Sequence, residues 1–346
     1  MKNKIEQQIN WQQLEQYVKT IIPVLSDSPL EITPFTAGYS NLTYLIEIGE
    51  WTGVLRRPPF GQIPKNAHDM KREYQILKNI NPVYPLAPKP YLYCEDPAIM
   101  EKHFYIMEKK DGVVIDHAIP DVFEDNDVTR KMISEAAVHT LAHLHSIDYQ
   151  AANLDHLGRP EGYLERQVHG WIKRYNAAKT NEILGVDKLE KWLIENIPMS
   201  QQPTIVHNDF KLNNMMFSKE HPREVVGVFD WEMSTIGDPL TDLGTTLAYW
   251  AEPGEPETGL TSVTGSSGFI SRKDFLEKYA RLTGRDVSEI NFYLTFAFYK
   301  IAGILQQIYY RWRLGDAKDE RFSKLGVGIS NLMSLAYRSQ HQELLK

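Results

Sequence analysis

Apolar and polar positions alternate along an early part of the chain. The alternation runs through ITPFTAGYSNLTYLIEIGEWTGVLRRPP, which begins at Ile32, and the pair Gly49–Glu50 interrupts it with a turn signal. A period of two is typical of half-buried β-strands, so this segment predicts two antiparallel strands joined by a turn. The segment HFYIMEKKDGVVI, which begins at His103, again has strand character. Together these segments predict a small antiparallel sheet.

A helix is predicted between these strands. In NAHDMKREYQILKNI, the residues Met70, Tyr74 and Leu77 fall at helical spacing. Asn66 is the expected cap of this helix, and Asn81–Pro82 is its expected stop. The helix and the strands form a predicted amino-terminal lobe that covers residues 1–108.

The rest of the chain, residues 109–346, has mainly helical periodicity. TRKMISEAAVHTLAHLHSID places an apolar stripe on one helical face, and long helical patterns recur from Lys188 and from Ser271 to the end. The exception is the pair MMF and VVGVFD, which flanks the polar turn SKEHPRE and predicts a β-hairpin. We therefore predict an α+β fold with a small antiparallel-sheet lobe and a larger, mainly helical lobe. We expect the cleft between them near Glu108 to Gly112.

Composition and charge narrow the class of protein. The chain is 42% hydrophobic and 24% charged, which is typical of folded soluble proteins. Its 346 residues exceed the usual size of one compact core, which supports two lobes. The formal net charge of −7 argues against electrostatic binding of nucleic acid. The single cysteine, Cys94, fits a reducing cytoplasm, and we expect its thiol to be buried.

One segment has enough apolar residues to suggest a membrane span. It runs from Phe292 to Tyr310, but Lys300 lies at its middle and Gln306–Gln307 follow, all of them costly in hydrocarbon. We therefore expect a buried helix of the larger lobe. The amino terminus lacks the apolar core of a signal peptide. We expect a cytoplasmic protein with no membrane or nucleic-acid partner, and the sequence leaves its oligomeric state open.

A dense polar cluster lies in IVHNDFKLNNMMF, Ile205 to Phe217. Alone it could be a surface turn, because Asn and Asp tolerate turn conformations. However, the predicted hairpin brings Asn214, before its first strand, to the same end as Asp230, after its second. With Asp209 these residues supply two carboxylates and one amide oxygen. Such hard donors suit Mg²⁺ completed by water and phosphate oxygens, whereas Zn²⁺ prefers His and Cys.

At this point the sequence resembles a known superfamily. HNDFKLNN, followed by FDWE, is similar to the catalytic loop and metal segment of the aminoglycoside phosphotransferase and choline kinase superfamily. His207, Asp209 and Asn214 fill the pattern H-x-D-x-x-x-x-N, and Asp230 follows one hairpin later. The resemblance covers about Phe35 to Trp250. It implies a two-lobed protein-kinase-like fold and an ATP- and Mg²⁺-dependent enzyme, a phosphotransferase with the alcohol group of a small molecule as acceptor.

The resemblance assigns roles to the residues of the catalytic segment. Asp209 would orient and deprotonate the acceptor hydroxyl, and Lys211 would stabilise charge on the transferring phosphate. Asn214 and Asp230 would hold Mg²⁺. We expect His207 to organise the loop, and an ordinary hydrogen-bonded core histidine is the alternative.

Two further segments resemble the nucleotide-binding parts of the superfamily. TAGYSNLTY is similar to the loop that covers the nucleotide, where Gly38 lets the backbone approach phosphate and Ser40 and Asn41 offer donors. A plain hairpin turn is the alternative. YIMEKKDG fits the connector between the lobes, where backbone groups near Glu108 would meet the adenine edge.

The strand VLRRPP departs from the superfamily pattern. Arg56 stands where the usual phosphate-binding lysine is expected, with Arg57 as an alternative. Arginine grips phosphate and carboxylate through paired donors, so Arg56 could bridge ATP and Glu73, the expected partner glutamate on the predicted helix. Glu232, in FDWE, is a further candidate near the metal or phosphates.

Within the superfamily, the segments GYSNLTY, VLRRPP, HNDFKLNNMMF and DWEMSTIGDPLTDLG are most similar to the kinase-like domain of acyl-CoA dehydrogenase family members ten and eleven. This resemblance implies a hydroxyacyl-type acceptor. An aminoglycoside or choline-type kinase remains an alternative. So does a nucleotide-binding regulatory pseudokinase, which the Arg56 departure suggests and the complete set of transfer residues opposes. A metal-dependent phosphohydrolase would need more ligands than this sequence arranges.

The segment after the catalytic motifs carries three more expectations. Asp238 and Asp242 are expected to cap and brace the following helix. Tyr249 and Trp250 would line an acceptor pocket or pack in the core. The Gly-, Ser-, Thr- and Pro-rich stretch Ala251 to Phe269 predicts a mobile loop near the acceptor, with a surface linker as the alternative.

Overall fold

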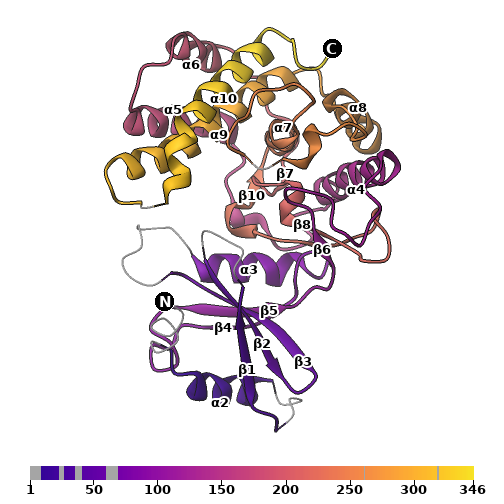
Figure 1. Ribbon diagram of the computed structural model, residues 1–346, viewed down its shortest axis with the longest axis vertical. Helices are drawn as coiled ribbons and strands as arrows, with labels where there is room; N and C mark the ends of the chain where they lie inside the picture. Colours follow the sequence, from indigo (N-terminus) through magenta and orange to yellow (C-terminus); the bar gives the residue numbers. More distant parts are fainter. Residues whose placement is uncertain (1–8, 23–26, 36–40, 60–68, 261, 318) are drawn as a thin grey trace. The chain divides into compact units, whose positions relative to one another are not determined.

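The computed structural model describes residues 9–22, 27–35, 41–59, 69–260, 262–317 and 319–346 (Figure 1). The chain forms two compact units. The first consists of residues 1–111 together with 227–232, and the second of residues 112–226 together with 233–346. A short segment of the later sequence therefore belongs to the first unit.

The first unit is built on one antiparallel sheet. Its strands follow the order β1-β2-β3-β5-β4. Their bounds are β1 Leu30–Pro34, β2 Leu42–Ile48, β3 Trp51–Arg57, β4 Pro90–Cys94 and β5 Phe104–Glu108, and the helices of the unit are α2 Trp11–Ile21 and α3 Met70–Ile80. Gly49 takes a φ of 59° in the turn between β2 and β3, a conformation that glycine adopts at little cost. The predicted strand, turn and strand are confirmed.

The core of the first unit follows from the alternation in its strands. In β2 the side chains of Tyr44, Ile46 and Ile48 are buried, while the residues between them are partly exposed. They pack in one cluster with the buried face of α2. Cys94 belongs to the same cluster, so the expected burial of its thiol is confirmed.

The helix α3 begins at a different cap from the one expected. The side chain of Asp69 accepts a hydrogen bond from the Arg72 backbone N–H at 3.0 Å, so Asp69 is the N-cap. Asn66, the expected cap, lies outside the described residues. Asn81 is the C-cap of α3, so the predicted stop at Asn81–Pro82 is confirmed. Asp caps helices as well as Asn does, so cap preference gave no reason to choose Asn66 over Asp69, which lies three positions later.

The second unit is mainly helical, as predicted. Its helices are α4 Asp127–His145, α5 Tyr163–Ala178, α6 Val186–Glu195, α7 Pro239–Tyr249, α8 Arg272–Thr283, α9 Ile290–Arg313 and α10 Leu325–Gln340. The short strands β7 Thr204–Val206 and β10 Thr235–Gly237 pair with each other, and β6 Val113–Val114, β8 Met215–Phe217 and β9 Val225–Val228 form the order β6-β8-β9. The last pair, β8 and β9, is the predicted hairpin.

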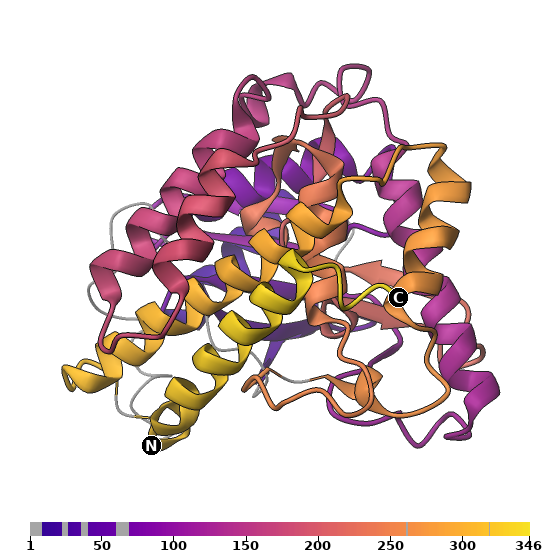
Figure 2. The same ribbon diagram turned by 90° about the horizontal axis from the view of Figure 1, so that it is seen from above.

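The helix α9 packs at the centre of this helical unit. It contacts α5, α7 and α10, and Figure 2 shows α9 and α10 running side by side. Most of its side chains from Ile290 to Gln306 are buried, including Lys300. The expected buried helix is therefore confirmed. Within the described ranges, no helix has the length and apolar character needed to cross a membrane.

Several hydrogen bonds connect the segment 251–269 to its surroundings. The fully buried Arg272 donates to both carboxylate oxygens of Glu255 and, through its Nε, to the Leu247 carbonyl at 2.8 Å. The Thr264 hydroxyl donates to the Ala251 carbonyl at 3.0 Å. The segment is thus tied to neighbouring backbone and, through Glu255, to an arginine beyond it, and its mobility stays a prediction.

Candidate active site

The predicted catalytic loop lies between β7 and β8 of the second unit. The Asp209 carboxylate accepts a hydrogen bond from Asn214 Nδ2 at 2.9 Å, and Lys211 Nζ lies 3.0 Å from the same oxygen. Asn214 Nδ2 also donates to the Asp209 carbonyl at 2.8 Å. The Asp209 side chain remains 18% exposed, so a ligand can reach it. The structure thus brings three of the predicted residues together within one loop.

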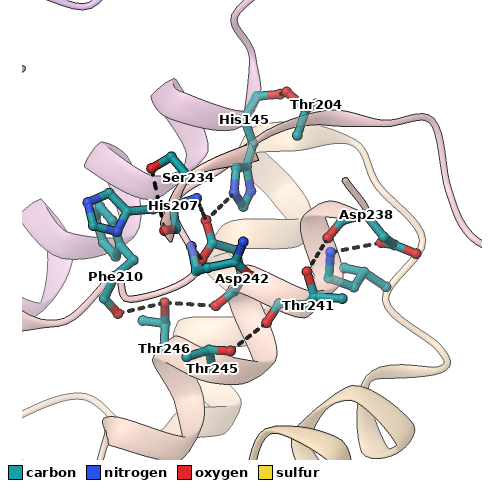
Figure 3. Close-up of polar contacts among 12 residues, drawn as sticks. His145, Thr204, His207, Phe210, Ser234, Asp238, Thr241, Asp242, Thr245 and Thr246 are labelled. Atoms are coloured by element: carbon teal, nitrogen blue, oxygen red, sulfur yellow. Dashed lines mark hydrogen bonds and ion pairs between the residues drawn. The ribbon is translucent and has the colours of Figure 1, made fainter. Parts of the chain in front are cut away.

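The buried carboxylate of Asp242 holds the backbone of this loop (Figure 3). It accepts the backbone N–H of His207 at 2.5 Å and that of Asn208 at 2.8 Å. Asp238 is the N-cap of α7 and accepts the Leu240 N–H at 3.0 Å, as expected. Asp242, expected to cap or brace the helix, instead braces the catalytic loop. The sequence around Asp242 does not predict this role, because the residues that Asp242 binds lie far from it in the chain.

A second buried residue completes the Asp242 site. His145 Nε2, at the end of α4, lies 3.2 Å from Asp242 Oδ2, and its Nδ1 is 2.7 Å from the Tyr279 hydroxyl. Burial lowers the pKa of His145. Burial acts to raise the pKa of Asp242, but the hydrogen bond from His145 and the nearby His207 hold it below its usual value. The network assigns a neutral His145 that donates from Nε2 to a charged Asp242 and accepts from Tyr279.

A small cavity lies beside Lys211 in the second unit. Its volume is about 30 Å³, which is enough for one or two water molecules. Its walls combine polar and apolar side chains: Ile115, Asp116, Ala137, Phe210, Lys211, Leu212, Asn213, Met215, Thr246, Tyr249, Trp250, Ser262, Val263 and Thr264. Tyr249 and Trp250 therefore line a cavity. Trp250 is also core, since its ring packs 5.1 Å from that of Phe275.

Tyr249 contacts the catalytic loop from this cavity. Lys211 Nζ lies 5.0 Å from the centre of its ring, within the range of a cation–π interaction. Burial raises the pKa of Tyr249 well above its usual value, and the charge of Asp209 and a hydrogen bond to it act in the same direction. The sequence predicted that Tyr249 lines a pocket or packs in the core, whereas the structure also places it against both Asp209 and Lys211.

In the first unit, Arg56 joins two carboxylates. Its Nη1 lies 2.5 Å from Glu73 Oε1, and its Nη2 bonds Asp230 Oδ1. Arg57 is also buried, but its Nε donates to the Pro58 carbonyl at 3.1 Å. The structure therefore brings Arg56, rather than the alternative Arg57, to Glu73.

Burial and neighbouring charges shift the pKa values of Glu73 and Arg56. Burial raises the pKa of Glu73 to about 7, against the lowering effect of Arg56. Burial opposes the charge of Arg56, but Glu73 and Asp230 hold its pKa above its usual value. Asp230 has a φ of 67°, which is uncommon outside glycine and tolerated best by Asn and Asp. An arginine shared by two carboxylates fixes the position of Asp230.

The other predicted nucleotide contacts are only partly described. Asn41 Nδ2 donates to Glu232 Oε2 at 3.3 Å within the first unit. Glu108 N donates to the Lys89 carbonyl at 2.8 Å, and its carboxylate accepts the Lys89 N–H at 3.0 Å, so Glu108 ties β5 to the start of β4. Gly38 and Ser40 lie outside the described residues. The adenine contact near Glu108 stays a prediction.

The two predicted metal ligands belong to different units. Asn214 lies in the second unit and Asp230 in the first, so their joint hold on one ion stays a prediction. Among the residues that the structure describes, no group of three or more His, Cys, Asp or Glu side chains could hold a metal ion.

The amino-acid sequence of this chain is similar to those of known proteins. The profile described as the phosphotransferase enzyme family matches residues 31–274. Human acyl-CoA dehydrogenase family member 11 is 36% identical over 301 residues, which cover 85% of this chain and 38% of that protein. Mouse acyl-CoA dehydrogenase family member 10 is 33% identical over 333 residues, 94% of this chain and 30% of that protein. The chain thus spans well under half the length of these relatives.

Solved structures share the fold. A protein from Ralstonia eutropha JMP134 classed as an aminoglycoside phosphotransferase superposes with a TM-score of 0.82 at 29% identity, covering 96% of this chain and 98% of that one. Choline kinase from Cryptosporidium parvum Iowa II gives 0.66 at 14% identity, covering 96% and 97%. A ternary complex of aminoglycoside phosphotransferase APH(4)-Ia with ADP and hygromycin B gives 0.60 at 12% identity, covering 94% and 98%. The predicted protein-kinase-like fold is confirmed.

Proposed function

The chain belongs to the phosphotransferase enzyme family, and from this premise we propose that it is an ATP- and Mg²⁺-dependent small-molecule kinase. It is a phosphotransferase of the aminoglycoside phosphotransferase and choline kinase type, with an alcohol group as acceptor. We further propose ATP as the nucleotide, Mg²⁺ as the metal and a hydroxyacyl-type metabolite as the acceptor.

The arrangement of Asp209 carries this proposal. In the proposed reaction the acceptor hydroxyl oxygen attacks the γ-phosphorus of ATP, its proton passes to Asp209, and the bond to the β-phosphate oxygen breaks to release ADP. Asn214 holds one carboxylate oxygen of Asp209, so the carboxylate is fixed before the acceptor arrives. Lys211, 3.0 Å from Asp209, would stabilise the charge of the transferring group.

The donor chemistry of the residues fits Mg²⁺ and a nucleotide. Asn214 commits its amide nitrogen to Asp209, so its amide oxygen is the atom that would bind a cation. The Asp230 carboxylate is partly exposed and fixed by Arg56. Hard oxygen donors of this kind suit Mg²⁺, which when bound supplies neutralisation of phosphate charge. The Arg56 guanidinium would contact the phosphates while Glu73 holds its other side.

The acceptor class is supported by the cavity beside Lys211. Its lining contains one carboxylate, Asp116, next to the cation of Lys211 and several apolar side chains. A polyamine such as an aminoglycoside would favour several carboxylates. The relatives with the name acyl-CoA dehydrogenase family members support an acyl-type acceptor instead.

A screen tests this proposal directly. The protein is incubated with Mg²⁺, ATP and a library of hydroxy metabolites that includes hydroxyacids, hydroxyacyl thioesters, choline and aminoglycosides, and phosphorylated products are resolved by mass. We expect a product with a hydroxyacyl compound that requires Mg²⁺ and disappears in Asp209→Asn. A product only with choline or an aminoglycoside would move the acceptor to the alternative class.

The regulatory alternative rests on one observation. Arg56 replaces the usual lysine and bonds Asp230, a proposed metal ligand. A regulatory pseudokinase would bind nucleotide without transferring phosphate. Binding of Mg·ATP without any phosphorylated product in the screen would favour it.

A further inference from the structure

Lys300 is a buried cation that the proposed reaction does not use. It lies at the middle of α9, is 5% exposed, and its Nζ donates to the Asn208 carbonyl at 3.1 Å. Burial lowers the pKa of Lys300, and the carboxylates of Asp242 and Asp209 act in the opposite direction. A buried ammonium in an apolar helix is costly unless it is hydrogen-bonded and paired with charge. Its partner here is the backbone of the catalytic loop.

The carbonyl that Lys300 contacts belongs to the peptide unit that leads into Asp209. The N–H of the same peptide unit, that of Asp209, donates to His207 Nδ1 at 3.3 Å. Both polar groups of this peptide unit are therefore held, one by Lys300 and one by His207. The rotation of this peptide unit sets the direction in which the Asp209 side chain leaves the backbone.

Asn208 itself is in an unusual conformation. Its φ of 66° lies in the left-handed region, which costs free energy for a residue other than glycine. The Asn208 side chain accepts from the Tyr163 hydroxyl at 3.0 Å and donates to the Met233 carbonyl at 3.0 Å. Its backbone N–H is held by Asp242. Such a conformation persists only where the surroundings over-determine it, and Lys300 supplies the contact to its carbonyl.

We propose that Lys300 is a positioning residue for phosphoryl transfer, which orients the Asn208–Asp209 peptide unit and thereby the Asp209 carboxylate. This inference rests on the proposed function, in which Asp209 accepts the proton of the acceptor hydroxyl. Lysine suits the position because its long side chain reaches from α9 to the loop, and its charge offsets the two carboxylates of Asp209 and Asp242.

The test compares two variants of the same helix. Lys300→Met removes the contact to the loop. Gln306→Met is the matched control, because Gln306 is also buried and donates to a backbone carbonyl, that of Ala178 at 2.9 Å. Tyr163, which contacts Asn208 of the catalytic loop, is the first residue of α5, whereas Ala178 is its last. The hydrogen bond of Gln306 therefore lies away from the catalytic loop. Both variants lose a buried donor, but only one loses a contact to Asn208.

We expect Lys300→Met to lower kcat on the order of 10²-fold, because misplacement of a reacting group by about 1 Å costs this much. The KM for ATP should change less than about threefold, and Gln306→Met should keep kcat within the same margin. Hydrogen–deuterium exchange should rise for the peptide covering residues 207–214 in Lys300→Met and remain unchanged there in Gln306→Met. Lys300→Gln, which keeps an amide donor, should fall between wild type and Lys300→Met.

The outcomes separate this inference from the proposed function. If the wild-type protein phosphorylates no hydroxyl compound, the proposed function fails, while the exchange contrast between the two variants still tests the contact of Lys300 with the loop. Equal kcat and equal exchange at residues 207–214 in Lys300→Met and Gln306→Met would overturn the inference. Failure of both Lys300 variants to fold, with Gln306→Met folded, would assign Lys300 to stability and also overturn it.

Discussion

Asp242→Asn tests whether the buried carboxylate under the catalytic loop supports both folding and catalysis. The Asp242 carboxylate is fully buried and receives three donors, the N–H groups of His207 and Asn208 and the Nε2 of His145. Asparagine has nearly the same shape but only one oxygen. Whichever way its amide is turned, its NH₂ group faces a donor.

The structure gives the size of the expected effect. If the amide oxygen of the variant faces His207 and His145, its NH₂ group faces the N–H of Asn208. In the wild type this backbone nitrogen lies 2.8 Å from a carboxylate oxygen of Asp242. The change loses one hydrogen bond to a charged group, which is worth about 1.5–3 kcal/mol, and leaves the buried N–H of Asn208 unpaired at about 1–3 kcal/mol. We expect a loss of about 3–5 kcal/mol in the free energy of unfolding. Because Asn208 precedes Asp209, we also expect kcat to fall on the order of 10²-fold.

Urea unfolding, followed by tryptophan fluorescence, and steady-state kinetics measure the two effects. Asp238→Asn is the matched control, since Asp238 is also buried and is the N-cap of the same helix, α7. Its carboxylate accepts the Tyr293 hydroxyl at 2.7 Å and the Leu240 N–H at 3.0 Å, so the control should also lose about 1.5–3 kcal/mol but preserve kcat, because neither donor belongs to the catalytic loop. If Asp242→Asn turns over like the control, the loop does not depend on this carboxylate and the reasoning is wrong.

Three other changes probe separate parts of the structure. The pKa of His145 is lowered from its usual value of 6.5 in the folded state, so the unfolded state binds more protons as pH falls below that value. The free energy of unfolding of the wild type, measured by urea unfolding, should therefore fall as pH drops through 6.5, and that of His145→Asn should fall less. Arg272→Met leaves Glu255 without its buried partner and should cost about 3–5 kcal/mol while admitting protease cleavage within residues 251–269. Arg56→Lys keeps the charge but cannot fork to both Glu73 and Asp230, so Mg·ATP affinity should fall about tenfold, as calorimetric titration would show.

The elements of the first unit could be predicted because their signal is local. The alternation in Leu42–Ile48 and the turn at Gly49 are written in adjacent residues, and both are confirmed. The return of residues 227–232 to the first unit could not be predicted in this way, since it depends on contacts between distant segments. Periodicity reports which face of an element is buried, but it does not report the neighbour that buries it.

The residues of the candidate site could be predicted from the sequence, whereas the residues that hold its backbone in place could not. Asp209, Lys211 and Asn214 share one short motif, and the structure brings them together. Asp242 was assigned to its own helix because aspartate near a helix start usually caps it, whereas its partners lie in the loop after β7. The composition of residues 251–269 predicts a loop, but it does not predict the ion pair of Glu255 with Arg272, which lies outside the segment.

The most direct test of the central claim is phosphate transfer by wild type, Asp209→Asn and Asp230→Ala, measured with nucleotide titrations in the presence and absence of Mg²⁺. We predict that Asp209→Asn keeps its affinity for Mg·ATP but loses turnover on the order of 10²–10⁴-fold, as for removal of a general base. Asp230→Ala should also weaken Mg²⁺-dependent nucleotide binding, because it removes a charged oxygen ligand. A wild-type protein that binds ATP and transfers phosphate to no hydroxyl compound, together with an Asp209→Asn variant unchanged in every property, would contradict the claim.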